Sequence, residues 1–286
     1  MEANVKRSLA QSAVRIRMDV VTGTHAAKSG HPGGSMSIAD ILSYLYMYKL
    51  NVDPKNPEME DRDRFVLSKG HAAPALYGAL AERGFIPRED IATLRKPDSY
   101  LQGHPNCLTT PGVEMSTGSL GQGFSVAVGM ALGAKLKGAS YRTYAVLGDG
   151  ELQEGEIWEA AMFASAKNLD NLVAVVDNNN LQIDGTIEEV NSPYPIPEKF
   201  EAFGWNVICI DGHDFDQIDE AFNAAEQCKG KPTVLVAKTT KGKGVSFMED
   251  QVGWHGKGPN DEEYETAMQE LNAQLAALEA EGGHHV

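Results

Sequence analysis

The sequence predicts an α/β fold in which a parallel sheet carries helices on both faces. Short apolar runs rich in β-branched residues alternate with longer stretches in which apolar residues recur at helical spacing. Parallel strands need long crossover connections, and helices that cover the sheet form them. The 286 residues, 42% of them hydrophobic, can bury a large core. No repeat, low-complexity tract or flexible linker divides the chain, so we expect one domain over residues 1–286.

Both ends of the chain are expected to be helical. Apolar residues recur at helical spacing near residues 4–28 and 36–50, and the following NVDPKNPEMEDRD is typical of a loop because it is rich in turn-forming residues. These helices would form an N-terminal arm. A C-terminal helix, packed on the domain or on a partner chain, is indicated by apolar residues at the same spacing: Tyr264, Met268, Leu271, Leu275 and Leu278.

The middle of the chain supplies the predicted sheet. Five segments have the composition of β-strands: residues 64–67, 142–147, 172–176, 206–210 and 233–237. Helices are expected between them near residues 119–137, 153–168 and 214–228. In the first of these helices, small residues recur at positions that would let a second helix pack closely: Gly121, Ser125, Gly129 and Gly133.

The composition excludes several classes of protein. The formal net charge is -15, whereas nucleic acid or an anionic membrane surface requires clustered Lys and Arg, so neither is expected as a partner. The three cysteines, Cys107, Cys209 and Cys228, fit no disulfide or metal-ligand spacing, which is typical of a reducing compartment. The N-terminus lacks a signal-peptide core, and no apolar run reaches the length of a membrane span. We therefore expect a cytoplasmic protein.

Two polar clusters follow neighbouring predicted strands. Asp149 lies between Gly148 and Gly150 after one strand, and Asn178-Asn179-Asn180 follow the next. Because ligands of parallel sheets bind beyond the carboxyl ends of the strands, both clusters should share one edge. A carboxylate, an amide oxygen and a backbone carbonyl suit Mg²⁺, which would take its remaining ligands from water and a diphosphate. The glycines would allow a tight turn and a close approach to phosphate, and a helix beginning near Gln153 would direct its N-terminus at the anion. Taken singly, each cluster could be an ordinary turn.

With these clusters the chain resembles the transketolases. GDGELQEG followed by DNNNLQIDG is similar to the thiamin diphosphate motif of that family. Further segments occur in the order of a transketolase N-terminal half: SGHPGG (29–34), SKGHAAPALYG (68–78), GHP (103–105), STGSLGQG (116–123), KTTKGKG (238–244) and WHG (254–256). The resemblance therefore covers nearly the whole chain and implies the thiamin-diphosphate-binding type of α/β domain, called the PP domain.

The resemblance implies a set of cofactor and metal ligands. Asp149, Asn179 and the carbonyl of Leu181 would hold Mg²⁺, with Ca²⁺ or Mn²⁺ as substitutes. His71 and Gly150 would lie near the diphosphate of thiamin diphosphate, and Glu154 would support the diphosphate loop. The remaining implied cofactor contacts are Gly118 and Leu120 beside the aminopyrimidine, with Gly148, Asn179 and Ile183.

The histidines divide into two groups. A lone His in a Gly-rich loop is more often a turn or surface residue than a catalyst. The resemblance nevertheless implies that His31, His104 and His255 face the substrate, where they would bind sugar hydroxyls and a carbonyl and transfer protons. His71 also stands in a Gly-bounded motif of the family, whereas the remaining four histidines match no family position: His25, His213, His284 and His285. Lys238, Lys241 and Lys243 suit either a solvated loop or the partners of an anionic ligand.

The chain departs from the family in sequence and in length. Ser119 stands where many transketolases have Pro, and Glu151-Leu152 follow GDG where Cys is frequent; we expect both changes to be conservative for cofactor binding. In the family, the activating glutamate, the aromatic residue that stacks on the aminopyrimidine and the arginines that bind the sugar phosphate lie in two further domains. We therefore expect the N-terminal subunit of a split transketolase, paired as α2β2 with a C-terminal subunit that carries the pyrimidine-binding domain.

Three functions remain open at the level of sequence. The favoured one transfers a two-carbon ketol unit from a ketose to an aldose, the sugar carrying phosphate or another anion such as sulfonate. The α subunit of a 2-oxo acid dehydrogenase or decarboxylase would share GDG and Asn but should lack the histidines of SGHPG, GHP and WHG. A non-catalytic cofactor-binding protein would have no need to keep them. The sequence has all of these histidines.

Overall fold

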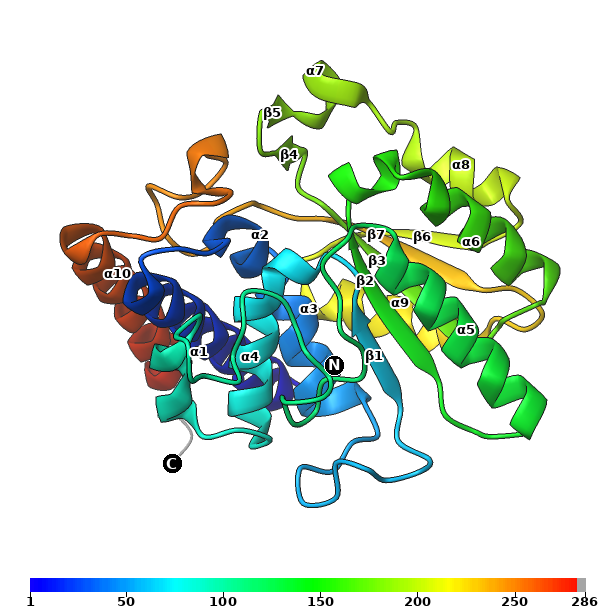
Figure 1. Cartoon of the computed structure of the whole chain (residues 1–286), viewed down its shortest axis with the longest axis horizontal. Helices are drawn as coiled ribbons and strands as arrows, with labels where there is room; N and C mark the ends of the chain where they lie inside the picture. The colour runs from blue at the N-terminus through cyan, green and yellow to red at the C-terminus, as the bar shows by residue number, and fades with distance from the viewer. Residues whose placement is uncertain (282–286) are drawn as a thin grey trace.

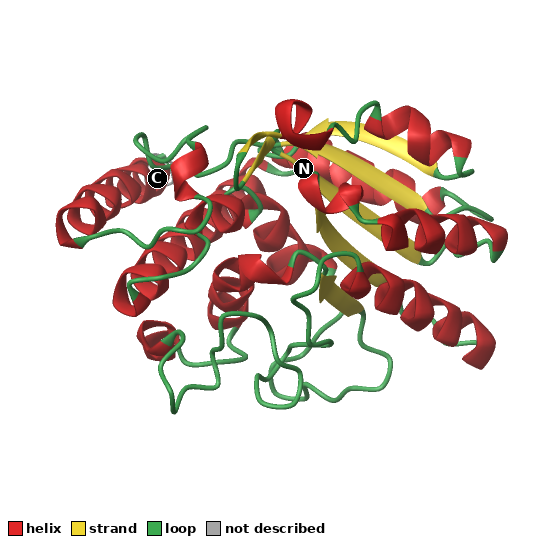
Figure 2. Ribbon diagram, turned by 45° about the horizontal axis from the view of Figure 1, so that its top comes forward, coloured by secondary structure: helices red, strands yellow, loops and turns green. Residues whose placement is uncertain are grey.

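A five-stranded parallel sheet lies between two layers of helices in the computed structural model, which describes residues 1–281 (Figure 1, Figure 2). The strand order is β1-β2-β3-β7-β6, and every neighbouring pair is parallel. The strands are β1 (Arg64–Leu67), β2 (Thr143–Gly148), β3 (Leu172–Asn178), β6 (Asn206–Asp211) and β7 (Thr233–Lys238). The predicted fold class is confirmed, and each predicted strand is present within one or two residues of its expected ends.

Each face of the sheet has its own hydrophobic core. Along β2, Tyr144 and Val146 pack in one core whereas Ala145 and Leu147 pack in the other, because successive side chains of a strand point to opposite faces. The first core joins the sheet to α3 (Ala39–Tyr44) and α9 (Phe215–Gln227). The second joins it to α5 (Gln122–Lys137), α6 (Gly155–Ala166) and α8 (Ile196–Ala202). The expected helices on both faces are therefore observed.

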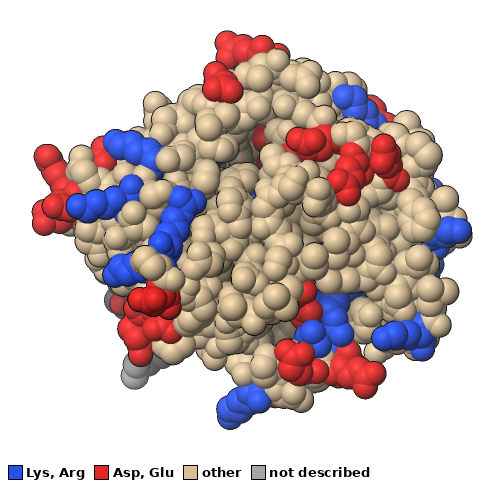
Figure 3. Space-filling view, in the orientation of Figure 1, with Lys and Arg blue, Asp and Glu red and all other residues tan. Residues whose placement is uncertain are grey.

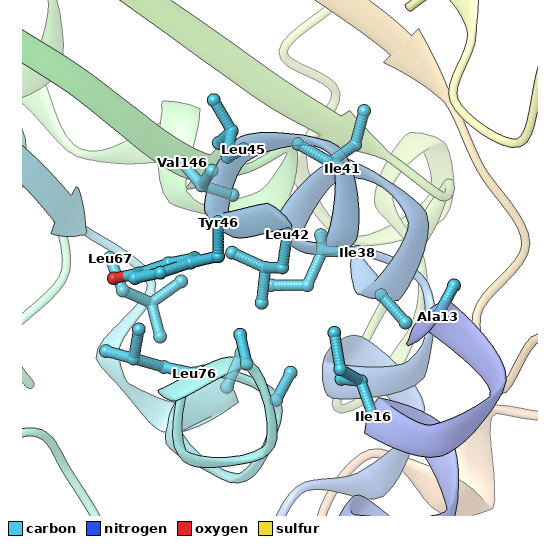
Figure 4. Packing of buried hydrophobic residues seen from close by; sticks show 14 of the residues in the cluster. Ala13, Ile16, Ile38, Ile41, Leu42, Leu45, Tyr46, Leu67, Leu76 and Val146 are labelled. Carbon is cyan, nitrogen blue, oxygen red and sulfur yellow. The ribbon is translucent and has the colours of Figure 1, made fainter. Parts of the chain in front are cut away.

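The N-terminal helices form a layer beside the sheet. Helix α1 (Ala3–Ala27) packs against α4 (Ala73–Arg83) and α10 (Asp261–Ala280). Figure 4 shows Ile16 of α1, Leu42 of α3 and Leu76 of α4 around the same part of the core, to which Val146 of the sheet also belongs. The C-terminal helix α10 packs on this domain, since its Ala267 and Leu271 are fully buried in the same core. Of the two placements that the sequence allowed, on this domain or on a partner chain, the structure shows the first.

Several elements differ from the sequence prediction. The helix expected over residues 36–50 is divided into α2 (Pro32–Met36), α3 and a π-helical turn at Leu45–Lys49. Helix α6 begins at Gly155, close to the expected start near Gln153, and follows a 3-10 turn (Gly150–Gln153). Helix α5 begins at Gln122, so residues 116–121 form a loop. Helix α4 was not predicted because almost all of its residues are apolar and buried, which removes the amphipathic pattern.

A small lobe follows β3 above the carboxyl edge of the sheet (Figure 1). It contains the antiparallel pair β4 (Leu181–Gln182) and β5 (Gly185–Thr186) and the short helix α7 (Ile187–Asn191). The capping box of Thr186 and Glu189 begins α7. The lobe therefore places the residues that follow the Asn cluster over the end of the sheet.

The expected close packing along α5 is observed only in part. Ser125 Oγ donates to Glu156 of α6 at 2.6 Å, so the start of α5 lies against a second helix. A Cβ atom added at Gly129 or Gly133 would meet no atom within 4 Å, so no second helix among residues 1–281 packs there. The histidines His284 and His285 lie outside the described residues. In the part of the chain that is described, no helix is both long enough and apolar enough to cross a membrane.

Candidate active site

A cavity of about 330 Å³ opens at the carboxyl edge of the sheet, between the ends of β1, β2 and β3. Every site residue predicted from the sequence lines it: His31, His71, His104, Gly118, Leu120, Gly148, Asp149, Gly150, Glu154, Asn179, Leu181, Ile183 and His255. These residues come from segments up to 224 positions apart, from His31 to His255, and the parallel sheet brings them together. The lining also contains residues that were not predicted as site residues: Gly34, Lys69, Glu151, Gln153, Gln182 and Lys241.

Asp149 and the Asn cluster meet as expected. Strands β2 and β3 pair in register so that Gly148 lies opposite Asp177. Asp149 Oδ2 accepts from the backbone N–H of Asn180 at 2.6 Å, and Oδ1 accepts from that of Gly150 at 2.8 Å. Burial, reinforced by the nearby Asp177 carboxylate, raises the pKa of Asp149 to about 7. The two backbone donors and the nearby Lys69 oppose this rise in pKa without cancelling it, so a bound cation would further stabilise the carboxylate.

A second buried carboxylate, Asp177, fixes the segments around Asp149. It accepts from Lys69 Nζ at 2.5 Å, from Ser37 Oγ and Asn179 Nδ2 at 2.8 Å each, and from Thr239 Oγ1. Burial opposes the charge of Asp177, but Lys69 and the hydroxyl donors hold its pKa below the usual range. The contact to Nδ2 also sets the orientation of the Asn179 amide, whose Oδ1 accepts from the backbone N–H of Leu181 at 3.1 Å and keeps a second lone pair for a metal.

Lys241 reaches the cavity from the segment after β7. Its Nζ donates to the carbonyl of Leu181 at 3.0 Å and to Nδ1 of His255 at 2.8 Å. Because the ammonium can only donate, Nδ1 accepts and the neutral ring of His255 carries its proton on Nε2. Burial lowers the pKa of Lys241 to about 8. From the sequence, Lys241 could either lie in a solvated loop or bind an anionic ligand. In the structure its side chain is 1% exposed and lines the cavity, so it does not lie in a solvated loop.

His31, His71 and His255 form a cluster of rings. Their centroids are 5.2 Å apart for His31 and His71, 5.4 Å for His71 and His255, and 5.5 Å for His31 and His255. Burial, with neighbouring cations, lowers the pKa of His31 to about 4 and of His255 to about 3, and it lowers that of His71 well below its usual value. All three rings are therefore neutral at pH 7 and can both donate and accept hydrogen bonds.

The rim of the cavity is open. His104, Glu154 and Ile183 line the cavity but are exposed, Ile183 to 62%. Burial also lowers the pKa of His104. Apolar and polar side chains that face solvent beside a deep cavity are available for contact with a ligand or with another chain.

Glu151 is a site residue that sequence reasoning missed. It is 2% exposed, and its Oε1 accepts from Ser68 Oγ at 2.5 Å and from the backbone N–H of Gly121 at 2.9 Å. Its Oε2 accepts from the N–H of Gly148 at 3.0 Å. The side chain therefore ties the end of β1 and the loop before α5 to the residue that precedes Asp149. Ser68 and Gly121 lie 83 and 30 positions away in the sequence, so no local pattern could indicate this role.

The donor set fits a magnesium diphosphate. Asp149, the Asn179 amide oxygen and the Leu181 carbonyl are oxygen ligands at one end of the cavity. Among residues 1–281 no three His, Cys, Asp or Glu side chains gather as a metal site, so water and phosphate oxygens would complete the coordination. The expected tight turn is present as the 3-10 turn Gly150–Gln153, but neither Gly148 nor Gly150 has a positive φ, so the turn does not use the conformation that only glycine adopts readily. A Cβ at Gly150 would project to within 3.5 Å of Gln182 and narrow the space that a ligand needs.

Buried polar atoms in the lining also remain open to a ligand. His31 Nδ1 and Gln182 Nε2 are buried and have no hydrogen-bond partner among the described residues. Buried polar groups in native proteins are nearly always paired, and exceptions call for an explanation. A polar ligand in the cavity would provide the missing partners.

Comparison with known proteins agrees with this geometry. A family model described as transketolase, thiamine diphosphate binding domain, matches residues 7–277. The chain belongs to the transketolase family. It is 47% identical over 247 residues to a 6-deoxy-6-sulfo-D-fructose transketolase subunit of Clostridium sp., covering 86% of this chain and 90% of that one. It is 45% identical over 265 residues to one subunit of the apulose-4-phosphate transketolase of Phocaeicola vulgatus, covering 93% and 94%.

The solved transketolases share the fold but are longer. The crystal structure of transketolase from Campylobacter jejuni superimposes with a TM-score of 0.85 at 33% identity. The match covers 97% of this chain and 46% of that enzyme. The domain built on this parallel sheet thus corresponds to the thiamin-diphosphate-binding domain of the transketolases.

Replacement of Asp149 tests the metal assignment. Asp149→Ala should abolish Mg²⁺-dependent binding of thiamin diphosphate to the assembled enzyme while the fold persists, because the diphosphate loses its bridging cation. Asp184→Ala is the matched control, since Asp184 is an exposed acid in the neighbouring lobe. Unchanged cofactor affinity of Asp149→Ala in calorimetry would show that this carboxylate holds no metal.

Proposed function

We propose that this chain is the cofactor-binding subunit of a split transketolase that transfers a two-carbon ketol unit from a ketose to an aldose. The observation that carries the proposal is the cavity itself, where a buried Asp149 with a raised pKa lies with neutral His31, His71 and His255 in one lining. Three free cysteines among the described residues, Cys107, Cys209 and Cys228, support the expectation of a cytoplasmic enzyme.

The proposed cofactor pair is thiamin diphosphate with Mg²⁺. Asp149, Asn179 and the carbonyl of Leu181 would hold the metal, and Lys241 would face the anion at the same end of the cavity. When bound, thiamin diphosphate supplies the reactive carbon that takes up the two-carbon unit. Gly118, Leu120 and Ile183 would line the space for the rest of the cofactor, with Glu154 on the rim.

The histidines would act on the sugar. A neutral imidazole can donate from one nitrogen and accept at the other, so His31, His104 and His255 suit the alternating hydroxyl and carbonyl groups of a ketose. His31 Nδ1 is buried and has no partner among residues 1–281, which leaves it free to accept a hydroxyl proton. The donation of Lys241 to Nδ1 of His255 leaves the Nε2–H of that ring for the substrate.

The proposed substrate is an anionic sugar. The two relatives of matching length are named for a sulfonated fructose and for apulose 4-phosphate, so sulfonate and phosphate are both precedents in the family. The formal net charge of this chain is -15, and the groups that bind the anionic end are expected on the partner chain. The family match favours neither the 2-oxo acid dehydrogenase nor the non-catalytic alternative.

The proposed partner carries the pyrimidine-binding domain, in an α2β2 assembly. Both relatives of matching length are named as subunits. Helices α5 and α6 offer a docking face, because Leu136, Met162 and Phe163 are 79%, 59% and 42% exposed. Gly129 and Gly133 leave open space beside α5 for close approach of another helix. Figure 3 shows few charged side chains over α5 and its surroundings, as expected of a surface that a partner covers.

Replacement of the histidines tests their proposed role. His31→Ala or His104→Ala should lower kcat or raise the KM of the ketose, by about 100-fold in kcat/KM, because each removes a proton-transfer or hydroxyl-binding group. Affinity for thiamin diphosphate should stay near that of the unmodified enzyme. His25→Ala is the control, since His25 pairs with Asp261 away from the cavity. An equal loss of cofactor affinity in both variants would place these rings at the cofactor and refute the assignment.

Reconstitution tests the split enzyme. The purified chain should show no ketol transfer with thiamin diphosphate and Mg²⁺, because the residues that activate the aminopyrimidine are expected on the partner. Mixing with the partner should give activity and, by light scattering, the mass of two copies of each chain. Met162→Glu should weaken this assembly, because it places a charge in the apolar docking face. Full activity of the chain alone would contradict the proposal.

A further inference from the structure

A buried set of polar contacts joins the N-terminal helices to the segment that carries Lys241. Arg17 of α1 pairs with Asp40 of α3, and Asp40 Oδ2 lies 2.7 Å from His213 Nδ1. On the other side of the ring, the backbone N–H of Thr240 lies 2.9 Å from Nε2. The side chain of His213 is 16% exposed and that of Asp40 8%. His213 lies outside the sequence motifs described above, so its sequence position alone assigned it no role.

The contacts of His213 determine its protonation. A backbone N–H can only donate, so Nε2 must accept from Thr240 and the ring must be neutral with its proton on Nδ1. That proton is donated to Asp40. Burial opposes the negative charge of Asp40, but Arg17 and His213 hold the pKa of this carboxyl below its usual range. Asp40 therefore fixes the tautomer of His213 that can hold Thr240.

Thr240 lies between two backbone hydrogen bonds that attach its segment to the rest of the domain. On one side the N–H of Thr239 donates to the carbonyl of Asn178 at 3.2 Å, and on the other the N–H of Gly242 donates to that of Gly33 at 3.0 Å. Between these two backbone contacts, the N–H of Thr240 takes its acceptor from the His213 ring. Lys241 follows directly and turns its ammonium into the cavity, toward Leu181. The contact between His213 and Thr240 is thus one residue away from Lys241, whose ammonium group lines the cavity.

We propose that His213 is a positioning residue for Lys241. By accepting the Thr240 N–H, the neutral ring holds the backbone in the place from which Lys241 reaches the diphosphate end of the cofactor. The inference rests on the proposed function, in which Lys241 faces the cofactor anion. Among residues 1–281, the ring of His213 forms hydrogen bonds with Asp40 and Thr240, and neither of these residues lines the cavity or is a proposed metal ligand.

Two substitutions separate the contacts of His213. His213→Gln can place an oxygen near the position of Nε2 and so keep an acceptor for Thr240, but it loses the contact to Asp40. His213→Asn can keep a donor near the position of Nδ1 but is too short to accept from Thr240. In the assembled enzyme, titrated with thiamin diphosphate in Mg²⁺, we expect the Gln variant to bind within about threefold of the unmodified enzyme. We expect the Asn variant to bind about 10- to 100-fold more weakly.

A double-mutant cycle shows whether the effect passes through Lys241. In a Lys241→Met background, His213→Asn should weaken cofactor binding by no more than about twofold, because the cation that it positions is already gone. A structural role would lower the melting temperature and the affinity alike in both backgrounds. Equal affinities of the Gln and Asn variants, or a full loss in the Lys241→Met background, would overturn the inference. Failure of the unmodified enzyme to bind the cofactor would overturn the proposed function, and this inference with it.

Discussion

The candidate site depends on one buried carboxylate, Asp177 at the end of β3. It collects donors from four separate segments through Ser37, Lys69, Asn179 and Thr239. Removing one partner of a buried ion pair such as Asp177 and Lys69 typically costs about 3–5 kcal/mol, because the other charge is left uncompensated. These contacts hold the loops after β1, β3 and β7 in one arrangement, so the ligand groups are in place before a ligand arrives.

Electrostatics explain how so acidic a chain can accept an anion. The carboxylate of Asp177 is neutralised by Lys69, whereas Asp149, at the same edge, keeps a raised pKa because burial and the charge of Asp177 outweigh its two backbone donors and the more remote Lys69. Burial lowers the pKa of Lys241 to about 8 even though the Asp149 and Asp177 carboxylates favour its charged form. The neighbouring histidines are neutral for the same reason, since burial disfavours their charged forms. A cation bound at Asp149 and an anion bound beside Lys241 would each relieve an unfavourable local charge.

Much of this arrangement could be predicted from the sequence, because it follows from local patterns. Alternating strands and helices predict the parallel sheet. The positions of Asp149 and Asn179 after adjacent strands predict that the two side chains lie at the same edge of that sheet. The histidines that stand beside glycine were identified through the sequence motifs of the family. Glu151 and His213 could not be found in this way, since their partners, Ser68 and Gly121 for the first and Asp40 and Thr240 for the second, are distant in the chain. Helix α4 was missed because its burial on all sides leaves no periodic pattern.

The central claim is that this edge of the sheet binds a diphosphate through a metal. Calorimetry of the assembled enzyme with thiamin diphosphate and with thiamin, each in the presence and absence of Mg²⁺, tests it most directly. The account predicts tight binding of thiamin diphosphate only when Mg²⁺ is present, and weak binding of thiamin whether or not the metal is added. Binding of both compounds with equal affinity and without Mg²⁺ would contradict it.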